Sequence, residues 1–305
     1  MPVDVNRPGP WTHRNLTARG TRFHAALAGP EAPTGAETVG PLTLLVHGFP
    51  ECWWTWRHVV PALAQAGHRV AALDLRGFGG SDRPPSGYDL VTLAQDLAAV
   101  VRSLGHERAV VVGAGLGGQV AWTLPHVAPD LTTAIVPVGA PHPLALRSLR
   151  SRALSGPALQ YASLQIPGLA ERRLRSRSAL EGLLRSWAGP HTREAVAEEA
   201  PYYAELLSRP GAAHSALEPL RNLVLSRAET AALDKPVAVP VLSVQGELDP
   251  VQPAQAYARD THHVTGNLRQ ATIRRSGHFP QEEAPAELVR ALLPFLADVA
   301  PAAST

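Results

Sequence analysis

Two side chains and one glycine turn in this 305-residue chain have the types and the setting that chemistry requires. His278 follows a strand-like apolar run, and Asp249 lies in a Gly-Glu-Leu-Asp-Pro turn after another such run. A carboxylate that orients an imidazole makes it a general base, which takes a proton from water or from a hydroxyl group. The segment 110–122, VVVGAGLGGQVAW, predicts a buried strand, a sharp glycine turn and a helix start, the setting in which one large class of enzymes carries its nucleophile. Gly115 stands at the apex of this turn, and the segment contains no Ser, Asp or Cys.

The elements that must position these residues are short apolar runs that end in Gly or Asp and alternate with segments of helical spacing. Runs rich in Val, Ile and Leu suit strands that are buried on both faces, as in a parallel sheet. Strands are predicted at 42–48, 69–74, 109–115, 132–140, 239–246 and 269–277. Helices are predicted at 54–66, 89–104, 117–128 and 283–297, and an antiparallel edge hairpin at 11–20 and 21–29. The alternation predicts an α/β fold with a mostly parallel, doubly wound sheet.

The alternation of predicted strands and helices stops between residues 141 and 236. This segment is rich in Ala and Arg, has helical spacing and is broken repeatedly by proline. We therefore predict that residues 1–140 form the first part of an α/β core, that residues 141–236 form a helical cap inserted into it, and that residues 237–305 complete the core.

Composition and charge narrow the class of protein. The apolar content is typical of a globular domain, and no apolar run reaches the roughly eighteen residues of a transmembrane helix. The N-terminal residues lack the apolar stretch of a signal peptide, and Cys52 is the single cysteine, so we expect a cytoplasmic protein without an internal disulfide. The net charge is +2, and the arginines that gather at 147–185 accompany no nucleic-acid-binding motif. A solvated basic surface is therefore favoured over a nucleic-acid site.

Four strand ends carry informative motifs, and ligands of open α/β sheets collect at the carboxyl ends of the strands. Their order along the chain is a His-Gly-Phe-Pro loop at 47–50, the glycine turn, the turn that contains Asp249, and the turn that contains His278. The sequence resembles α/β-hydrolases of the epoxide hydrolase and haloalkane dehalogenase branch. The resemblance is carried by HGFPECWWTWR (47–57), DLRGFGGSDRP (74–84), GELDP (246–250) and GHFPQEEAP (277–285), and it extends over almost the whole core.

This resemblance implies roles for particular residues. His278 would be the general base that activates water, and Asp249 would orient it and stabilise its cation. His47, Gly48 and Pro50 would belong to the loop that, with the backbone N–H groups of Phe49 and Leu116, faces the reacting oxygen. The peptide bond before Pro50 is often cis in this family. Glu51 also fits the family pattern, although a solvated carboxylate at a helix N-terminus explains it equally well.

Two departures from the family pattern concern the chemistry directly. Gly115 stands where this branch carries an aspartate nucleophile. The glycine relieves the backbone strain of the turn, which makes the change easy for the fold and severe for the reaction. In the cap, epoxide hydrolases carry two tyrosines that hold the epoxide oxygen. Leu220-Arg221 stands where one Tyr-Arg pair is usual, and Tyr161 lies near the expected position of the other tyrosine.

Several other residues have chemical potential and a simpler interpretation. Cys52 could be a displaced nucleophile, but a buried packing role is favoured. His262 and His263 could bind a metal, but no cysteine or carboxylate spacing supports such a site, so neither a metal nor an organic cofactor is expected. Three tryptophans could line a pocket, and their helical spacing favours a core position for at least one of them: Trp53, Trp54 and Trp56.

Three functional hypotheses remain open from the sequence. The first is a weak or altered hydrolase that acts on a small apolar substrate through water activated by His278. The second is a pseudoenzyme that binds a small apolar ligand or a protein partner without turnover. The third is a scaffold, and the arginine-rich cap is the only feature of the sequence that supports this role. The expected partner is a small apolar molecule in a pocket between core and cap. Binding to nucleic acid or to a membrane is not expected. The sequence does not predict the oligomeric state.

Overall fold

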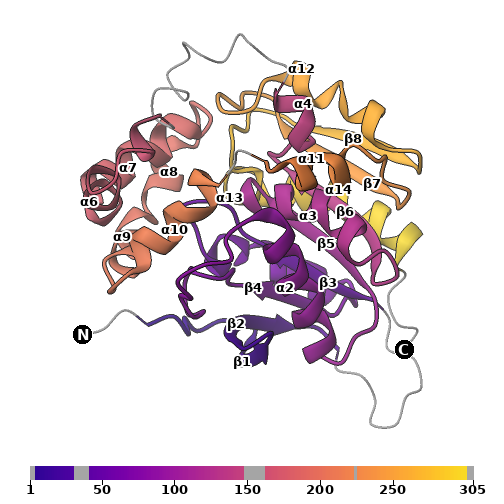
Figure 1. The fold of residues 1–305 in the computed structure, drawn as a ribbon, viewed down its shortest axis with the longest axis horizontal. Helices are drawn as coiled ribbons and strands as arrows, with labels where there is room; N and C mark the ends of the chain where they lie inside the picture. The colour runs from indigo at the N-terminus through magenta and orange to yellow at the C-terminus, as the bar shows by residue number, and fades with distance from the viewer. Residues whose placement is uncertain (1–3, 31–40, 148–161, 223–224, 301–305) are drawn as a thin grey trace.

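The computed structural model describes residues 4–30, 41–147, 162–222 and 225–300. Its centre is one sheet of eight strands in the order β1-β2-β4-β3-β5-β6-β7-β8 (Figure 1). The strands are β1 (Thr12–Ala18), β2 (Thr21–Ala28), β3 (Leu42–Val46), β4 (Val70–Leu73), β5 (Ala109–Ala114), β6 (Thr132–Val138), β7 (Val241–Gly246) and β8 (Leu268–Ile273). β2 pairs antiparallel with both β1 and β4, and every other pair is parallel. The predicted α/β class, the mostly parallel sheet and the edge hairpin are confirmed.

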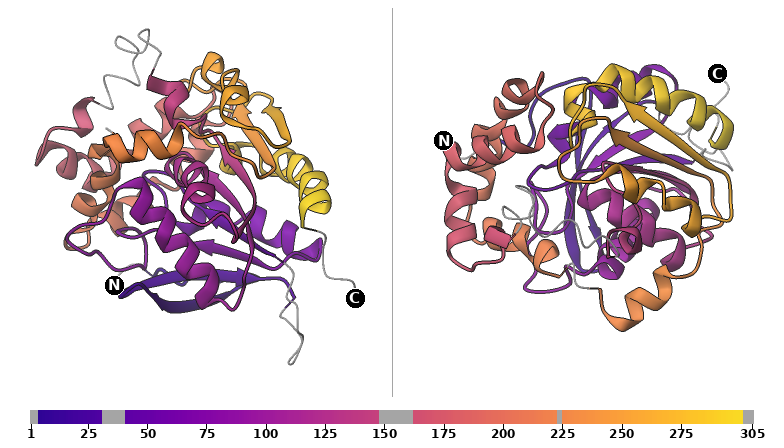
Figure 2. Two further views of the ribbon diagram at one scale, coloured as in Figure 1. Left: turned by 45° about the vertical axis from the view of Figure 1, so that its right-hand side comes forward. Right: turned by 90° about the horizontal axis from the view of Figure 1, so that it is seen from above.

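Helices cover both faces of the sheet, which is why its central strands are apolar along their whole length (Figure 2). α2 (Leu90–Ser103) and α3 (Leu116–Val127) pack together on one face, and α1 (Val59–Gln65) packs with α14 (Pro285–Val299) on the other. A short helix, η1 (Trp53–Trp56), precedes α1, and another, α13 (Pro280–Glu283), precedes α14. Two further short elements, α12 (Ala254–Tyr257) and η3 (Asp260–His263), lie between β7 and β8. All four helices predicted for the core are present, two of them divided into two pieces.

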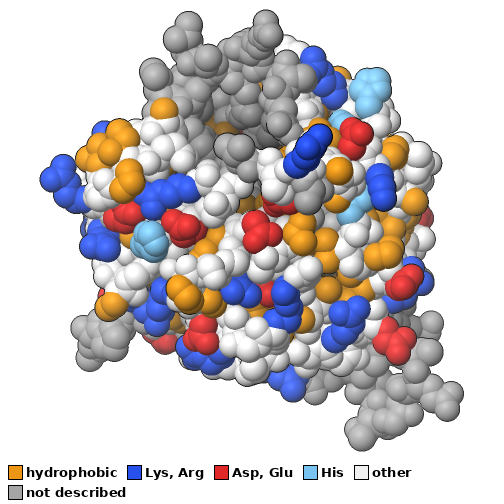
Figure 3. All heavy atoms as spheres, in the orientation of Figure 1, with side chains coloured by type: hydrophobic (Ala, Val, Ile, Leu, Met, Phe, Trp, Pro, Cys, Tyr) orange, Lys and Arg blue, Asp and Glu red, His pale blue; other side chains and the backbone are white. Residues whose placement is uncertain are grey.

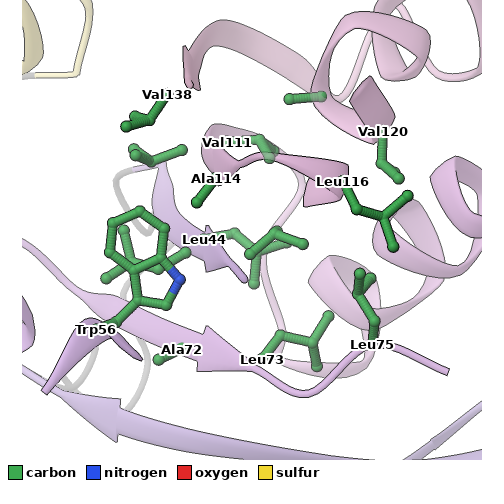
Figure 4. Packing of buried hydrophobic residues seen from close by; sticks show 14 of the residues in the cluster. Leu44, Trp56, Ala72, Leu73, Leu75, Val111, Ala114, Leu116, Val120 and Val138 are labelled. Carbon is green, nitrogen blue, oxygen red and sulfur yellow. The ribbon is translucent and has the colours of Figure 1, made fainter. Parts of the chain in front are cut away.

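The apolar core continues up to the glycine turn. Leu44 of β3 and Val111 of β5 have no exposed surface. Ala114 and Leu116, the two neighbours of Gly115, also belong to this cluster of buried apolar side chains (Figure 4). The backbone of the turn is therefore held in place against the sheet by packing on both sides.

The described residues between β6 and β7 form helices and no strand. These helices are α4 (Pro143–Arg147), α6 (Leu169–Arg175), α7 (Arg177–Trp187), α8 (Arg193–Ala197), α9 (Ala200–Leu207), α10 (Ala212–Arg221) and α11 (Arg227–Leu233). α6 to α10 gather at one side of the molecule, beyond the layers that cover the sheet (Figure 1). The boundaries 141–236 for a cap domain stay a prediction. None of the helices in the described ranges combines the length and the apolar character needed to cross a bilayer.

Some surface charges of the helical region are paired. Arg177 bonds to Glu181 at 2.8 Å, and Arg185 bonds to Glu194 at 2.9 Å. On the face drawn in Figure 3, basic side chains are interspersed with acidic ones.

A buried carboxylate ties the N-terminal hairpin to the sheet. Asp74, which has no exposed surface, accepts hydrogen bonds from His24 Nδ1 and from the backbone N–H groups of Trp53 and Gly80, each at 2.8 Å. His24 Nε2 in turn lies 3.0 Å from His13 Nδ1. Burial opposes the charge of Asp74, but the hydrogen bond and the charge of His24 outweigh it and lower the pKa of the carboxyl group.

The two histidines need a shared proton to complete this chain of hydrogen bonds. His13 Nε2 lies 2.9 Å from the carbonyl oxygen of Arg7, which only accepts, and the carboxylate of Asp74 at the other end also only accepts. The two outer ring nitrogens must therefore carry hydrogen, and one further hydrogen must lie between the two rings. Three hydrogens on two imidazoles correspond to one positive charge, which the nearby charge of Asp74 favours and which the burial of His13 opposes by lowering its pKa.

We expect Asp74→Asn to lower the free energy of unfolding by about 3–5 kcal/mol, because it leaves a buried cation without its partner. Urea denaturation measures this change. Asp82→Asn is the matched control, since Asp82 and its partner Arg22 are 44% and 51% exposed, and we expect it to cost about 1 kcal/mol or less. Equal losses in the two variants would contradict the role assigned to Asp74.

Candidate active site

The carboxyl ends of β3, β5, β7 and β8 bring the predicted residues into one place. Gly115 lies between β5 and α3 with φ 47° and ψ −111°, and its N–H donates to the carbonyl of Val138 at 2.9 Å. A Cβ atom added to Gly115 would lie 3.5 Å from Nε2 of His278 and 3.7 Å from Cα of Gly48. The histidine and the loop after β3 would thus be in van der Waals contact with a side chain at position 115.

His278 and Asp249 form a hydrogen-bonded pair. Nδ1 of His278 lies 3.0 Å from Oδ2 of Asp249, and both side chains are buried, with 6% and 1% of their surface exposed. The other oxygen of Asp249 accepts the N–H groups of Val251 at 2.7 Å and Gln252 at 3.0 Å. Because an ionised carboxylate only accepts, Nδ1 carries the hydrogen, and Nε2 is left as the basic atom that points toward Gly115.

The pKa of His278 reflects two opposed effects. Burial disfavours the imidazolium and by itself lowers the pKa, but the charge of Asp249 and the hydrogen bond to it outweigh burial, so the pKa lies above its usual value. The ring also packs edge-on against Trp187, with centroids 5.6 Å apart, and its backbone N–H donates to the carbonyl of Trp187 at 2.9 Å. The histidine is therefore held by the core through Asp249 and by the helical region through Trp187.

The loop after β3 is fixed by the ring of His47. This histidine is fully buried, its Nε2 accepts the N–H of Leu75 at 3.0 Å, and its Nδ1 donates to the carbonyl of Gly48 at 2.7 Å. Both ring nitrogens are thus engaged, and the side chain holds the loop instead of facing the site. The peptide bond between Phe49 and Pro50 is cis.

Two backbone N–H groups at the site have no acceptor within the described parts of the chain. They belong to Phe49, in the cis-proline loop, and to Leu116, the first residue of α3. The first N–H groups of a helix have no partner inside the helix and attract negative charge. The oxyanion-binding role that the resemblance implies for these two groups stays a prediction.

Glu51 is a functional candidate that sequence reasoning underrated. The structure contradicts the alternative of a solvated carboxylate, because Glu51 is only 3% exposed. Oε1 accepts from Thr55 at 2.6 Å and from Gln281 at 3.0 Å, and Oε2 lies 3.1 Å from the place of a Cβ atom on Gly48. Burial and the nearby charge of Glu282 raise the pKa of Glu51 to about 7. Thr55, four positions later, is one of its hydrogen-bond partners, but the presence of this threonine in the sequence does not tell whether Glu51 is buried or solvated.

A small cavity of about 10 Å³ borders Glu51 and Cys52. It lies between the loop after β3 and helices α9 and α10, with Tyr203 and Leu206 in its wall. This volume is about that of one water-sized sphere, and the carboxyl group is a polar partner that such a water needs.

The other candidate residues lie in positions that a packing role explains. Cys52 is 1% exposed, and burial raises the pKa of its thiol far above the usual value, which favours packing over reactivity. Trp53 and Trp56 are fully buried core residues, as expected for at least one of the three, and Trp54 is partly buried. His263 stacks on His142, with ring centroids 3.8 Å apart. Within the described residues, no group of three or more His, Cys, Asp or Glu side chains is placed to hold a metal ion.

One of the two cap positions lies within the described residues. Leu220 is buried in α10, and its neighbour Arg221 pairs with Glu171 at 3.0 Å. Tyr161 lies outside the described residues.

Comparison with known proteins identifies the family. The family model described as the alpha/beta hydrolase fold matches residues 41–285. The chain belongs to the α/β-hydrolase fold family. The matched region includes every site residue discussed above, from the loop after β3 to the turn that contains His278.

Several relatives of this chain are named as epoxide hydrolases. Epoxide hydrolase A of Mycobacterium tuberculosis is 31% identical over 93% of this chain and 97% of its own length. Epoxide hydrolase B of the same organism is 44% identical over a shorter stretch, which covers 42% of this chain and only 35% of that protein. Among solved structures, an epoxide hydrolase from an endophytic Streptomyces has a TM-score of 0.78 at 29% identity and covers 95% of this chain and 96% of its own.

We expect NMR titration of the His278 ring to give a pKa above 6.5 in the native protein and a lower pKa in Asp249→Asn, because burial is then less strongly opposed. A raised pKa in the folded state means that the stability contributed by His278 is fully present below pH 6.5 and is lost as the pH rises through the folded-state pKa. Asp298→Asn, at a site where the carboxylate is 57% exposed, serves as control. An unchanged pKa in Asp249→Asn would refute the pairing.

Proposed function

We propose that this protein is an epoxide hydrolase-like enzyme of weak or altered activity, in which His278 and Asp249 activate water directly. The observation that carries the proposal is the free Nε2 of His278, 3.5 Å from the place of a Cβ atom on Gly115. The resemblance to the family assigns the aspartate nucleophile to this position, and the glycine offers no atom that could form a covalent bond to substrate. The covalent route of the family is then closed, and the basic nitrogen faces space that a side chain would otherwise fill.

A water molecule in that space would be the nucleophile. Loss of an aspartate side chain makes room for about one water, which occupies roughly 30 Å³ in the liquid. Nε2 of His278 takes one proton from this water as its oxygen attacks, and Asp249 stabilises the imidazolium that forms. The N–H groups of Phe49 and Leu116 stabilise negative charge that develops on the substrate oxygen.

Glu51 is the candidate for the proton donor in this reaction. Its pKa of about 7 means that a large share of its carboxyl groups is protonated near neutral pH. Oε2 borders Gly48, on the loop that also presents the N–H of Phe49. A carboxylic acid at this place would donate a proton to the substrate oxygen. In relatives a cap tyrosine supplies this proton.

The substrate class follows from the walls around the histidine. Trp187 packs against the ring of His278, and the rings of Phe49 and Phe279 each lie 6.3 Å from that of Trp187. These aromatic surfaces favour a small apolar molecule with one electrophilic oxygen function, such as an epoxide, an ester or a lactone.

The alternative function is ligand binding without turnover. It is favoured by the coincidence of a glycine at position 115 with a buried leucine at position 220, because relatives would carry a nucleophile and a tyrosine acid at these places. A pocket that retained its apolar walls after losing both groups would bind a small apolar ligand, or a partner, and release it unchanged.

The activity is tested by incubating a panel of epoxides, esters and lactones with the native protein and with His278→Ala. We expect turnover that falls by about 100-fold or more in the variant, the usual contribution of a general base. His214→Ala is the matched control, since this histidine is 61% exposed on α10. Equal rates for the native protein and His278→Ala would end the hydrolase proposal in favour of binding.

The role of position 115 is tested by restoring the carboxylate. In Gly115→Asp combined with His278→Ala, we expect an epoxide to form an ester that persists, because no base remains to hydrolyse it, and intact-protein mass spectrometry detects the added mass. The left-handed φ of 47° predicts a stability cost of about 1–3 kcal/mol, so folding is checked by thermal melting. Gly115→Asn with His278→Ala is the control that cannot form the ester. A folded aspartate variant that stays unmodified across the panel would contradict the assignment.

A further inference from the structure

Glu283, at the end of α13, binds two distant segments of the chain at once. Its Oε2 accepts hydrogen bonds from the backbone N–H groups of Gly277 at 2.9 Å and Gly189 at 2.7 Å, and from the hydroxyl of Thr192 at 2.5 Å. Its Oε1 accepts the N–H of Phe279 at 3.0 Å. One carboxylate therefore collects all of these donors, and hydrogen bonds to a charged acceptor are the strong ones.

Two of these donors flank the candidate base. Gly277 and Phe279 are the residues immediately before and after His278, and Glu283 holds both of their N–H groups. The N–H of His278 itself donates to Trp187, at the end of α7. All three N–H groups of this turn are thus engaged by Glu283 or by the helical region, which sets the direction in which the imidazole leaves the backbone.

The other two donors belong to the helical region between β6 and β7. Gly189 and Thr192 lie between α7 and α8. The backbone there approaches the histidine turn so closely that side chains would not fit. A Cβ on Gly277 would lie 2.3 Å from the backbone nitrogen of Gly189, and a Cβ on Gly189 would lie 2.9 Å from Oε2 of Glu283. The two segments are in direct contact, with the carboxylate as their common acceptor.

We infer that Glu283 is a positioning residue that couples the segment 187–192 of the helical region to the orientation of His278. A displacement of this segment would withdraw two donors from Oε2 and would release the N–H of His278 from Trp187. The remaining bonds to Gly277 and Phe279 would then hold the turn less firmly, and Nδ1 of His278 would lose its alignment with Asp249. The placement of the base thus depends on the helical region as well as on the core.

A substitution on the opposite side of the contact separates the coupling role of Glu283 from a purely local role in the histidine turn. Thr192→Val keeps the shape of the side chain and removes only the hydroxyl donor, at a position 91 residues away in the sequence. Thr192→Ser keeps the donor. Glu287→Gln makes the same change as Glu283→Gln four residues farther along the chain, in α14, at a carboxylate without a side-chain hydrogen bond to any described residue.

The readouts are the NMR resonance of the Nδ1 proton of His278 and hydrogen exchange at the amides of Gly277 and Phe279. In Glu283→Gln we expect exchange at both amides to rise about tenfold or more, and the Nδ1 proton to shift upfield as its bond to Asp249 weakens. We expect Thr192→Val to change both readouts in the same direction by smaller amounts. Thr192→Ser and Glu287→Gln should leave both readouts at their native values.

Thr192→Val decides the inference if Glu283→Gln does not fold. A Thr192→Val protein in which exchange changes only at Gly189 and its neighbours, with the Nδ1 resonance of His278 unmoved, would overturn the coupling. The inference rests on the proposed role of His278 as the base, but both readouts are recorded without substrate. Failure of the turnover test and failure of this coupling are therefore distinguishable.

Discussion

The hydrogen bond between Nδ1 of His278 and Oδ2 of Asp249 is the interaction on which the rest of the site depends. It determines the tautomer of the ring, and it opposes the effect of burial on the pKa of the imidazole. It also leaves Nε2 as the basic atom that faces the glycine turn. The proposed mechanism requires this bond, because a buried, unpaired imidazole is a weak base with no fixed orientation.

Several buried polar contacts join the helical region to the core around this pair. Trp187 accepts the backbone N–H of His278, and the hydroxyl of Tyr203 donates to Glu282 at 3.2 Å. Arg57 bridges Glu282 of the core at 2.7 Å and Glu199 of the helical region at 3.2 Å. Burial raises the pKa of Glu282, and the Arg57 charge acts against this rise. These contacts join the helical region to the core beside the site, and each is strong only when both partners are in place.

The fold and the proximity of Asp249 and His278 were predictable from sequence, because local patterns and strand-end motifs encode them. Apolar runs and helical spacing gave the strands and helices of the core, and the strand-end motifs placed Asp249 and His278 at one edge of the sheet. Glu51 was not predictable, because the same glutamate at a helix start is either solvated or buried, depending on what packs over it. Helices α9 and α10 border the cavity beside it, and nothing in their sequences indicates that contact.

The sequence by itself determined the order of the strand-end residues and the absence of a side chain at Gly115. Only the tertiary structure decided that Nε2 of His278 faces this glycine, that Glu51 has a pKa of about 7, and that Glu283 connects the histidine turn to Thr192. The physical reason is that burial and hydrogen-bond partners arise between segments far apart in the chain. Periodicity and motifs describe neighbours along the sequence, whereas the chemistry of a buried group is set by its neighbours in space.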